Sequence, residues 1–176
     1  MIYLDFAKAF DTVDHSALLA KLRLYGVKGQ LFCWFKDYLT ERTQRVVLEN
    51  AASHWSPVSS GVPQGSILGP LLFTLFINDL PDEAAYGVKV ALYADDTKLY
   101  RNVSSAEHCD LIQDTLSNMH VWSQRNNIRF NMSKYKVLTV TRKKNPIASD
   151  YTLDGTAPTR VSEEKGLGVI ITSTLS

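Results

Sequence analysis

The chain has 176 residues, of which 45% are hydrophobic, and its formal net charge is +1. This composition excludes a disordered segment and predicts one folded domain with a single core. The near-neutral charge excludes a protein that attracts nucleic acid through its overall field. The longest apolar run, residues 71–77, is far shorter than the roughly 20 residues of a membrane-spanning helix, so we expect no membrane partner.

Apolar residues at three- and four-residue steps predict helices, and alternating apolar residues predict strands. In the first half these patterns predict, in chain order, a strand at 2–6, helices at about 14–25 and 29–39, a strand at 43–49, extended chain at 55–62 and an apolar helix at about 69–80. Asp14 or Ser16 can cap the first helix. Pro70 sets the start of the third helix, because proline is tolerated only in the first turn.

The second half is predicted to hold a hairpin around residues 95–96, a helix from about 104 to 127, and strands at 137–141, 151–153 and 167–172. The long helix carries a core-facing apolar stripe, made of Cys109, Ile112, Leu116, Met119 and Trp122. Cys33 and Cys109 are predicted to be buried free thiols. Strands and helices mix without a strict βαβ rhythm, which predicts an α+β fold with an antiparallel-rich sheet and helices packed on one face.

Three aspartates stand out because each lies where an apolar strand is predicted to end. Asp95 and Asp96 form the tip of the predicted hairpin, and Asp5 follows the first strand. Neighbouring carboxylates repel each other unless a cation lies between them. For an isolated Asp-Asp pair a solvated turn is the ordinary explanation. With a third carboxylate at another strand end, the set can converge on divalent metal ions, as in two-metal polymerases and nucleases.

The loop at residues 60–66 is the second unusual stretch, with Gly61 and Gly65 on either side of Pro63 and Gln64. Glycine lets a backbone approach a ligand closely, and the N-terminus of the helix that follows favours anions. The alternative is an ordinary loop that leads into a helix, with Gln64 as a surface residue.

These stretches together resemble the reverse transcriptases. The likeness lies in residues 4–11 (LDFAKAFD), 60–70 (SGVPQGSILGP) and 93–96 (YADD), and it is strongest to the non-LTR, LINE-type retrotransposons, particularly the jockey-like group. Residues 131–134 and 167–170 resemble the two motifs that follow in that family. The motifs occur in the family's order over essentially the whole chain, so the set is far more specific than any one of them.

The resemblance implies a polymerase palm over residues 1–176 and catalysis with two Mg²⁺ ions. Asp5, Asp95 and Asp96 would hold the metal, with Asp5 and Asp95 as the direct ligands. The backbone carbonyl of Phe6 would complete a metal shell.

Other roles follow from the same resemblance. Lys134 would be the general acid for pyrophosphate, with Lys136 as a rival, and a plain surface lysine is an equal alternative. Phe10 stands where the family carries an aromatic gate beside the sugar 2′ position, and a core aromatic is an equal alternative. Residues 167–170 would grip the primer end. The residues implied to border the incoming nucleotide and the template are Pro63, Gln64, Gly65 and Tyr93.

The implied activity is that of an RNA-directed DNA polymerase, which joins dNTPs to a DNA primer on an RNA template, in the nucleus and cytoplasm. Only four residues precede Asp5 and none is basic. We therefore expect a palm that lacks the fingers and thumb of a longer polyprotein. One alternative is a catalytically silent retrotransposon remnant that binds nucleic acid or protein. Another is a different two-metal enzyme such as a nuclease, which the loop at 63–65 does not support.

Overall fold

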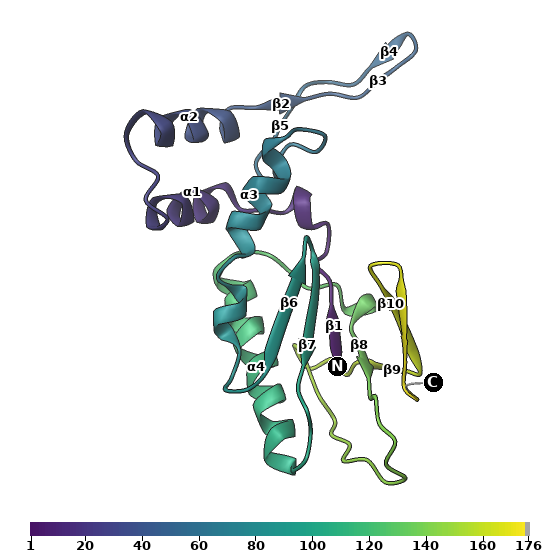
Figure 1. Ribbon diagram of the computed structural model, residues 1–176. Coiled ribbons are helices and arrows are strands. Elements are labelled where there is room, and N and C mark those ends of the chain that lie inside the picture. The colour runs from purple at the N-terminus through teal and green to yellow at the C-terminus, as the bar shows by residue number, and fades with distance from the viewer. Residues whose placement is uncertain (175–176) are drawn as a thin grey trace. The chain divides into compact units, whose positions relative to one another are not determined.

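The computed structural model describes residues 1–174, which divide into two compact units (Figure 1). The sheet unit comprises Met1–Ala7, Asp79–Arg125 and the chain from Arg129 onward. The helical unit comprises Lys8–Asn78 and Asn126–Ile128.

A five-stranded sheet forms the centre of the sheet unit, in the order β6-β7-β1-β8-β9 (Figure 1). The strands are β1 (Ile2–Leu4), β6 (Lys89–Tyr93), β7 (Asp96–Tyr100), β8 (Lys136–Leu138) and β9 (Thr159–Val161). β1 pairs antiparallel with β7 and with β8, and the β8–β9 pair is parallel. The predicted α+β class with a mostly antiparallel sheet is therefore confirmed.

The long helix α4 (Ala106–Arg125) supplies much of the core of the sheet unit. The five residues of its predicted apolar stripe are all buried, as the helical spacing required: Cys109, Ile112, Leu116, Met119 and Trp122. The Trp122 ring lies 6.1 Å from that of Phe6, and Phe6 stacks on Phe130 at 4.7 Å. These rings anchor the chain that leaves β1. Two short 3-10 helices, η2 (Leu80–Glu83) and η3 (Met132–Lys134), belong to the same unit.

β10 (Glu163–Gly166) and β11 (Val169–Thr172) form a two-stranded sheet of their own. The predicted strand at 167–172 begins two residues late, because Leu167 and Gly168 form the turn with positive φ angles of 51° and 80°. The predicted strand at 137–141 is shorter, since β8 ends at Leu138. The predicted strand at 151–153 is wrong: only an isolated bridge joins Leu153 to Thr156 there.

The helical unit contains η1 (Ala9–Asp11), α1 (His15–Leu24), α2 (Gly29–Leu39) and α3 (Leu68–Ile77). The three α-helices lie where the sequence predicts them, except that α3 ends at Ile77 instead of near residue 80. Their core is lined by Leu18, Leu22, Leu72, Phe73 and Phe76. The predicted strand at 43–49 forms only β2 (Thr43–Gln44) and β3 (Val47–Leu48), which pair with β5 (Ser56–Pro57) and β4 (Ala51–Ala52). This ribbon is exposed, so no core enforces a longer ladder.

The two cysteines and the apolar helices can be compared with the sequence expectations. Both cysteines are free, as expected, but Cys33 is exposed and only Cys109 is buried. None of the helices in the described part of the chain combines the length and apolar character that crossing a membrane requires.

Candidate active site

β1 and the β6–β7 hairpin bring the predicted carboxylates to one end of the sheet unit. β1 and β7 run antiparallel with Leu4 opposite Thr97, so Asp5 follows β1 where β7 begins with Asp96. The strand that leads into Asp5 therefore lies beside the Asp95-Asp96 hairpin, and a metal ion shared by these carboxylates stays a prediction.

The hairpin places the two neighbouring aspartates in different elements, Asp95 in the turn and Asp96 at the start of β7. Tyr93 pairs with Asp96 in the last rung of the ladder, so Ala94 and Asp95 form the turn. Ala94 has a φ of 50°, in the left-handed region that residues with a Cβ rarely adopt. Such strain persists where the surrounding structure imposes it, often at functional sites. Asp95 is half-buried in this turn, whereas Asp96 is an exposed strand residue.

Asp5 is buried, with 7% of its surface exposed, and it forms an ion pair with Lys134. Lys134 Nζ donates to Asp5 Oδ2 at 2.5 Å. The lysine ends η3, which is held against β1 because Asn131 N donates to the backbone oxygen of Asp5 at 2.7 Å. The Asn131 side chain in turn accepts from Ser133 N at 3.2 Å and caps η3. The backbone of this short helix thus positions the ammonium group.

The three aspartates and Lys134 act as one electrostatic group. Although Asp96 is exposed, the surrounding protein removes part of its water, which raises the pKa of Asp96, and the charges of Asp95 and Asp5 raise it further. The hydrogen bond and the charge of Asp5 raise the pKa of Lys134, and Asp95 and Asp96 add to this effect. Protonated Lys134 is therefore the cation that partly balances the carboxylates.

The donor set fits a divalent cation chemically. Carboxylate oxygens are the hard ligands that Mg²⁺ prefers. Beyond the effect of burial, the charges of Asp95 and Asp5 raise the pKa of Asp96, and such an ion would relieve this repulsion. However, no three His, Cys, Asp or Glu side chains among residues 1–174 are arranged as a metal site. Asp5 faces the ammonium group of Lys134 instead.

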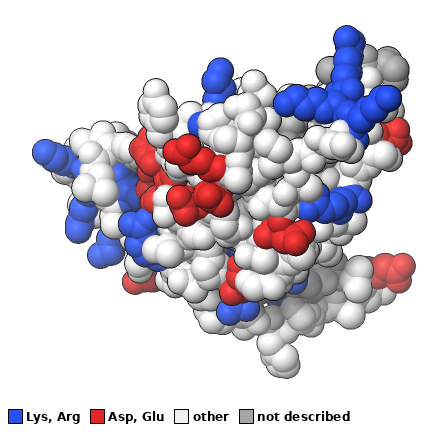
Figure 2. Space-filling view, turned by 90° about the horizontal axis from the view of Figure 1, so that it is seen from below, with Lys and Arg blue, Asp and Glu red and all other residues white. Residues whose placement is uncertain are grey.

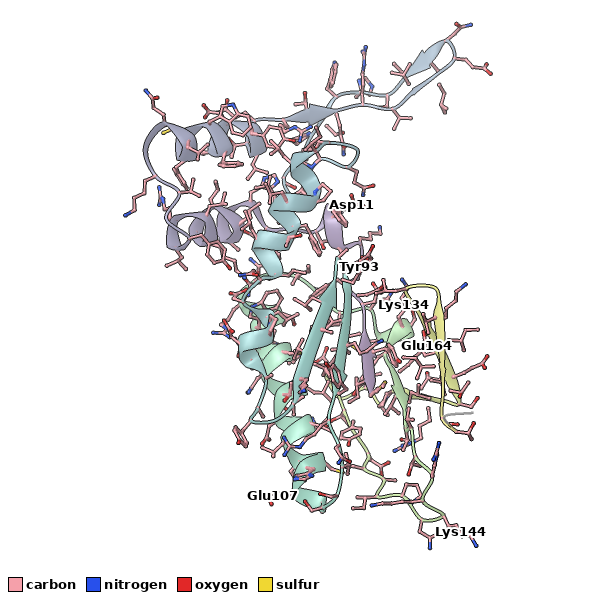
Figure 3. The ribbon with its side chains drawn as sticks, viewed as in Figure 1. Asp11, Tyr93, Glu107, Lys134, Lys144 and Glu164 are labelled. Carbon is pink, nitrogen blue, oxygen red and sulfur yellow. The ribbon has the colours of Figure 1, made fainter. Side chains whose placement is uncertain are left out.

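A cavity of about 370 Å³ opens beside this group, and its lining includes Asp5, Tyr93, Asp96, Lys134, Lys136 and Glu164. Figure 3 shows Tyr93, Lys134 and Glu164 at the same end of the sheet unit. Tyr93 is 63% exposed at the end of β6, whereas the Phe6 side chain is buried in the core. Glu164 was not predicted as a site residue; its carboxylate oxygens accept from Lys136 Nζ at 3.0 and 2.9 Å. No motif or apolar alternation marks Glu164.

The loop that contains Gln64 is built against the start of the helical unit. A Cβ on Gly61, which has a φ of 89°, would lie 2.8 Å from the backbone oxygens of both Phe10 and Asp11, so only glycine fits there. Val62 N donates to the Phe10 oxygen at 2.7 Å, and Gln64 Nε2 donates to Asp11 Oδ1 at 2.7 Å. Asp11 is thus a second residue that sequence analysis missed, although it lies inside the first motif.

Three further predicted substrate contacts, Phe10, Pro63 and Gly65, also lie in the helical unit. Phe10 is half-buried and its ring stacks on that of Phe73 at 4.7 Å, and its role as an aromatic gate stays a proposal. Pro63 and Gln64 help to line a polar cavity of about 610 Å³. The Pro63 oxygen accepts from Ser66 Oγ at 2.8 Å, and exposed Gly65 has a φ of 76°.

Comparison with known proteins then decides the family. Residues 1–171 match the family model described as reverse transcriptase (RNA-dependent DNA polymerase). The chain belongs to the reverse transcriptase family. The resemblance found in the sequence is therefore confirmed, and with it the expectation of a family that generally uses divalent metal ions and works on a nucleic-acid template and primer.

Named relatives of this reverse transcriptase chain come from mobile elements and transposons. It is 36% identical over 140 residues to the RNA-directed DNA polymerase from mobile element jockey of Drosophila melanogaster, covering 75% of this chain and 15% of that protein. It is 32% identical over 183 residues to the RNA-directed DNA polymerase from mobile element jockey of Drosophila funebris, covering 99% of this chain and 20% of that protein. It is 34% identical over 174 residues to the probable RNA-directed DNA polymerase from transposon X-element of Drosophila melanogaster, covering 97% of this chain and 19% of that protein. The chain spans 15 to 20% of the length of these relatives.

The structure groups the predicted site residues by unit. Asp5, Phe6, Tyr93, Asp95, Asp96 and Lys134 belong to the sheet unit, and Phe10, Pro63, Gln64 and Gly65 belong to the helical unit. Within each unit, residues of separate reverse transcriptase motifs lie together.

Proposed function

We propose that this chain forms the palm of an RNA-directed DNA polymerase, with its helices packed on one face of the sheet. The polymerase would join dNTPs to the 3′-hydroxyl of a DNA primer on an RNA template, as part of a longer polyprotein with fingers and thumb in the nucleus and cytoplasm. The observation that carries this proposal is the position of Asp5 beside the Asp95-Asp96 hairpin in a chain of this family.

In this proposal Asp5, Asp95 and Asp96 would hold two Mg²⁺ ions, with Asp5 and Asp95 as direct ligands and the Phe6 carbonyl completing a shell. When bound, the ions would lower the pKa of the primer hydroxyl and neutralise charge on the triphosphate and the leaving pyrophosphate. Lys134, which carries a proton beside the carboxylates, would be the general acid, with Lys136 as the alternative.

The remaining residues would select and orient the substrates. Phe10 would exclude the 2′-hydroxyl of a ribonucleotide by its bulk. The turn of the β10–β11 hairpin would contact the primer end. The border of the incoming nucleotide and template would be formed by Pro63, Gln64, Gly65 and Tyr93.

One observation favours a second function, a catalytically silent retrotransposon remnant that binds nucleic acid or protein. Asp5 forms an ion pair with Lys134, and in this second function the ion pair would persist because no cation displaces it. The two functions differ in whether the aspartates support nucleotide transfer.

The experiment is a chimera in which residues 1–176 replace the matching segment of the Drosophila funebris jockey polymerase, which covers 99% of this chain. Primer extension is measured on an RNA template with dNTPs and Mg²⁺. We expect extension by the chimera and none after Asp95→Asn, because the change removes a charged metal ligand. Asp114→Asn, the same change at an exposed position of α4, is the matched control and should leave extension intact.

Two outcomes would count against the proposal. Extension by the Asp95→Asn chimera at an unchanged rate would show that Asp95 is no ligand. A folded chimera without activity, beside an active parent protein, would favour the silent remnant.

A further inference from the structure

Asp5 is the most enclosed acid of the candidate centre, and its charge has a specific partner. Its side chain is 9% exposed, and Oδ2 accepts the 2.5 Å hydrogen bond from Lys134 Nζ. An ionised carboxylate is costly to bury without a compensating cation. In this structure the ammonium of Lys134 supplies that compensation.

The two side chains of this ion pair differ in how freely they can move. Asp5 is fixed at the end of β1, where its backbone oxygen accepts from Asn131 N at 2.7 Å. The Lys134 side chain is 58% exposed and ends the three-residue helix η3. A lysine carries its charge on a flexible four-carbon chain. Lys134 is therefore the partner that can move away while the carboxylate stays in place.

We propose that Lys134 is the resident counter-ion of Asp5 and competes with divalent cations for this carboxylate. The proposal rests on the proposed function, in which Asp5 is a metal ligand. A cation that takes Oδ2 of Asp5 displaces Lys134 from that oxygen, and the released ammonium then faces the cavity beside Asp96. Cation binding and the release of a proton-carrying lysine toward the substrate cavity would thus be one coupled step.

The competition between Lys134 and a cation should appear as a measurable change in cation affinity. A ligand binds more weakly when only a fraction of the molecules has its site free, and removing the competitor restores the intrinsic affinity. For a half-exposed ion pair we expect the loss of Lys134 to tighten cation binding by about three- to tenfold.

The test measures Mn²⁺ binding to residues 1–176 by the electron paramagnetic resonance signal of free Mn²⁺ at fixed ionic strength. Lys134→Met should lower the dissociation constant by about three- to tenfold. Lys134→Arg keeps the charge and the pairing, so its affinity should stay near that of the original chain. Lys98→Met is the matched control: Lys98 lines the same cavity, but its Nζ lies over the Tyr3 ring, 5.1 Å from the centroid. This control should change the affinity by less than about twofold.

A double-mutant cycle assigns the effect to the ion pair itself. In an Asp5→Asn background, Lys134→Met should no longer tighten binding. Thermal melts of every variant establish that it is folded. Equal binding by the original chain and Lys134→Met would overturn the competition, and so would an equal gain from Lys98→Met. Folded variants that all fail to bind Mn²⁺ would instead contradict the metal centre of the proposed function.

Discussion

At the residue scale, Asp14 shows how one carboxylate can organise the start of a helix. Its Oδ1 accepts from Ala17 N at 2.8 Å and its Oδ2 accepts from Asn127 Nδ2 at 3.0 Å. Burial alone would raise the pKa of Asp14, but these hydrogen bonds outweigh it, so the pKa is lowered. The sequence predicted the cap, because Asp is a preferred residue there, but Asn127 is distant in sequence and could not be predicted as a partner.

We expect Asp14→Ala to lower the free energy of unfolding by about 1 kcal/mol at neutral pH, because a helix cap is lost. Since the folded pKa of Asp14 is lowered, its contribution is present above the unfolded pKa of about 3.9 and is lost as the pH falls through the folded value. Urea unfolding at neutral and acidic pH measures both effects. Asp14→Asn, which keeps a capping side chain, is the control. A difference that stays constant down to the lowest pH would contradict the role of the charge.

At the element scale, the helices were predicted well and the short strands were not. A helix repeats its apolar contacts over several turns, as the buried stripe of α4 does, so the pattern is strong in the sequence. β9 and β10 have three and four residues, mostly exposed, and carry no such repeat. Their pairing depends on distant partners, such as β8 for β9. For the same reason Glu164 could not be predicted as the partner of Lys136.

The Lys136–Glu164 ion pair leads to a prediction about the β10–β11 hairpin. The pair joins this separate two-stranded sheet to β8, with side chains 33% and 19% exposed. We expect Glu164→Gln to speed amide hydrogen exchange in Val169–Thr172 by roughly two- to fivefold, because the hairpin opens more often. The charge exchange Lys136→Glu with Glu164→Lys should restore slow exchange. Glu163→Gln, at the exposed neighbouring position, is the control. Equal exchange in Glu163→Gln and Glu164→Gln would show that this ion pair does not hold the hairpin.

At the scale of the whole molecule, the ordered motifs predicted the family, but local patterns could not predict how the chain divides. The two units interleave along the sequence, since residues 126–128 return to the helical unit after α4. No composition change marks these crossings, because membership of a unit depends on long-range packing. Charged side chains of the described residues also form small local groups and no single extended patch on the face that Figure 2 shows, where acidic and basic groups are both present.

This distribution of charge predicts what residues 1–176 do alone. Phosphoryl transfer requires positive groups around a highly charged triphosphate. Lys134 and Lys136, which line the candidate cavity, are already paired with Asp5 and Glu164. With a net charge of +1, we expect weak binding to a labelled RNA–DNA primer–template, weakening further between about 50 and 200 mM salt.

We also expect no robust primer extension by residues 1–176 with Mg²⁺ and all four dNTPs, since two of the four lysines that line the cavity are already paired with carboxylates. Fluorescence anisotropy measures the binding, and a gel-based extension assay measures the activity, with the chimera as the positive control. Robust extension that Asp95→Asn abolishes would prove this prediction wrong. It would show that the carboxylates of the sheet unit, with the lysines already present, are sufficient for nucleotide transfer.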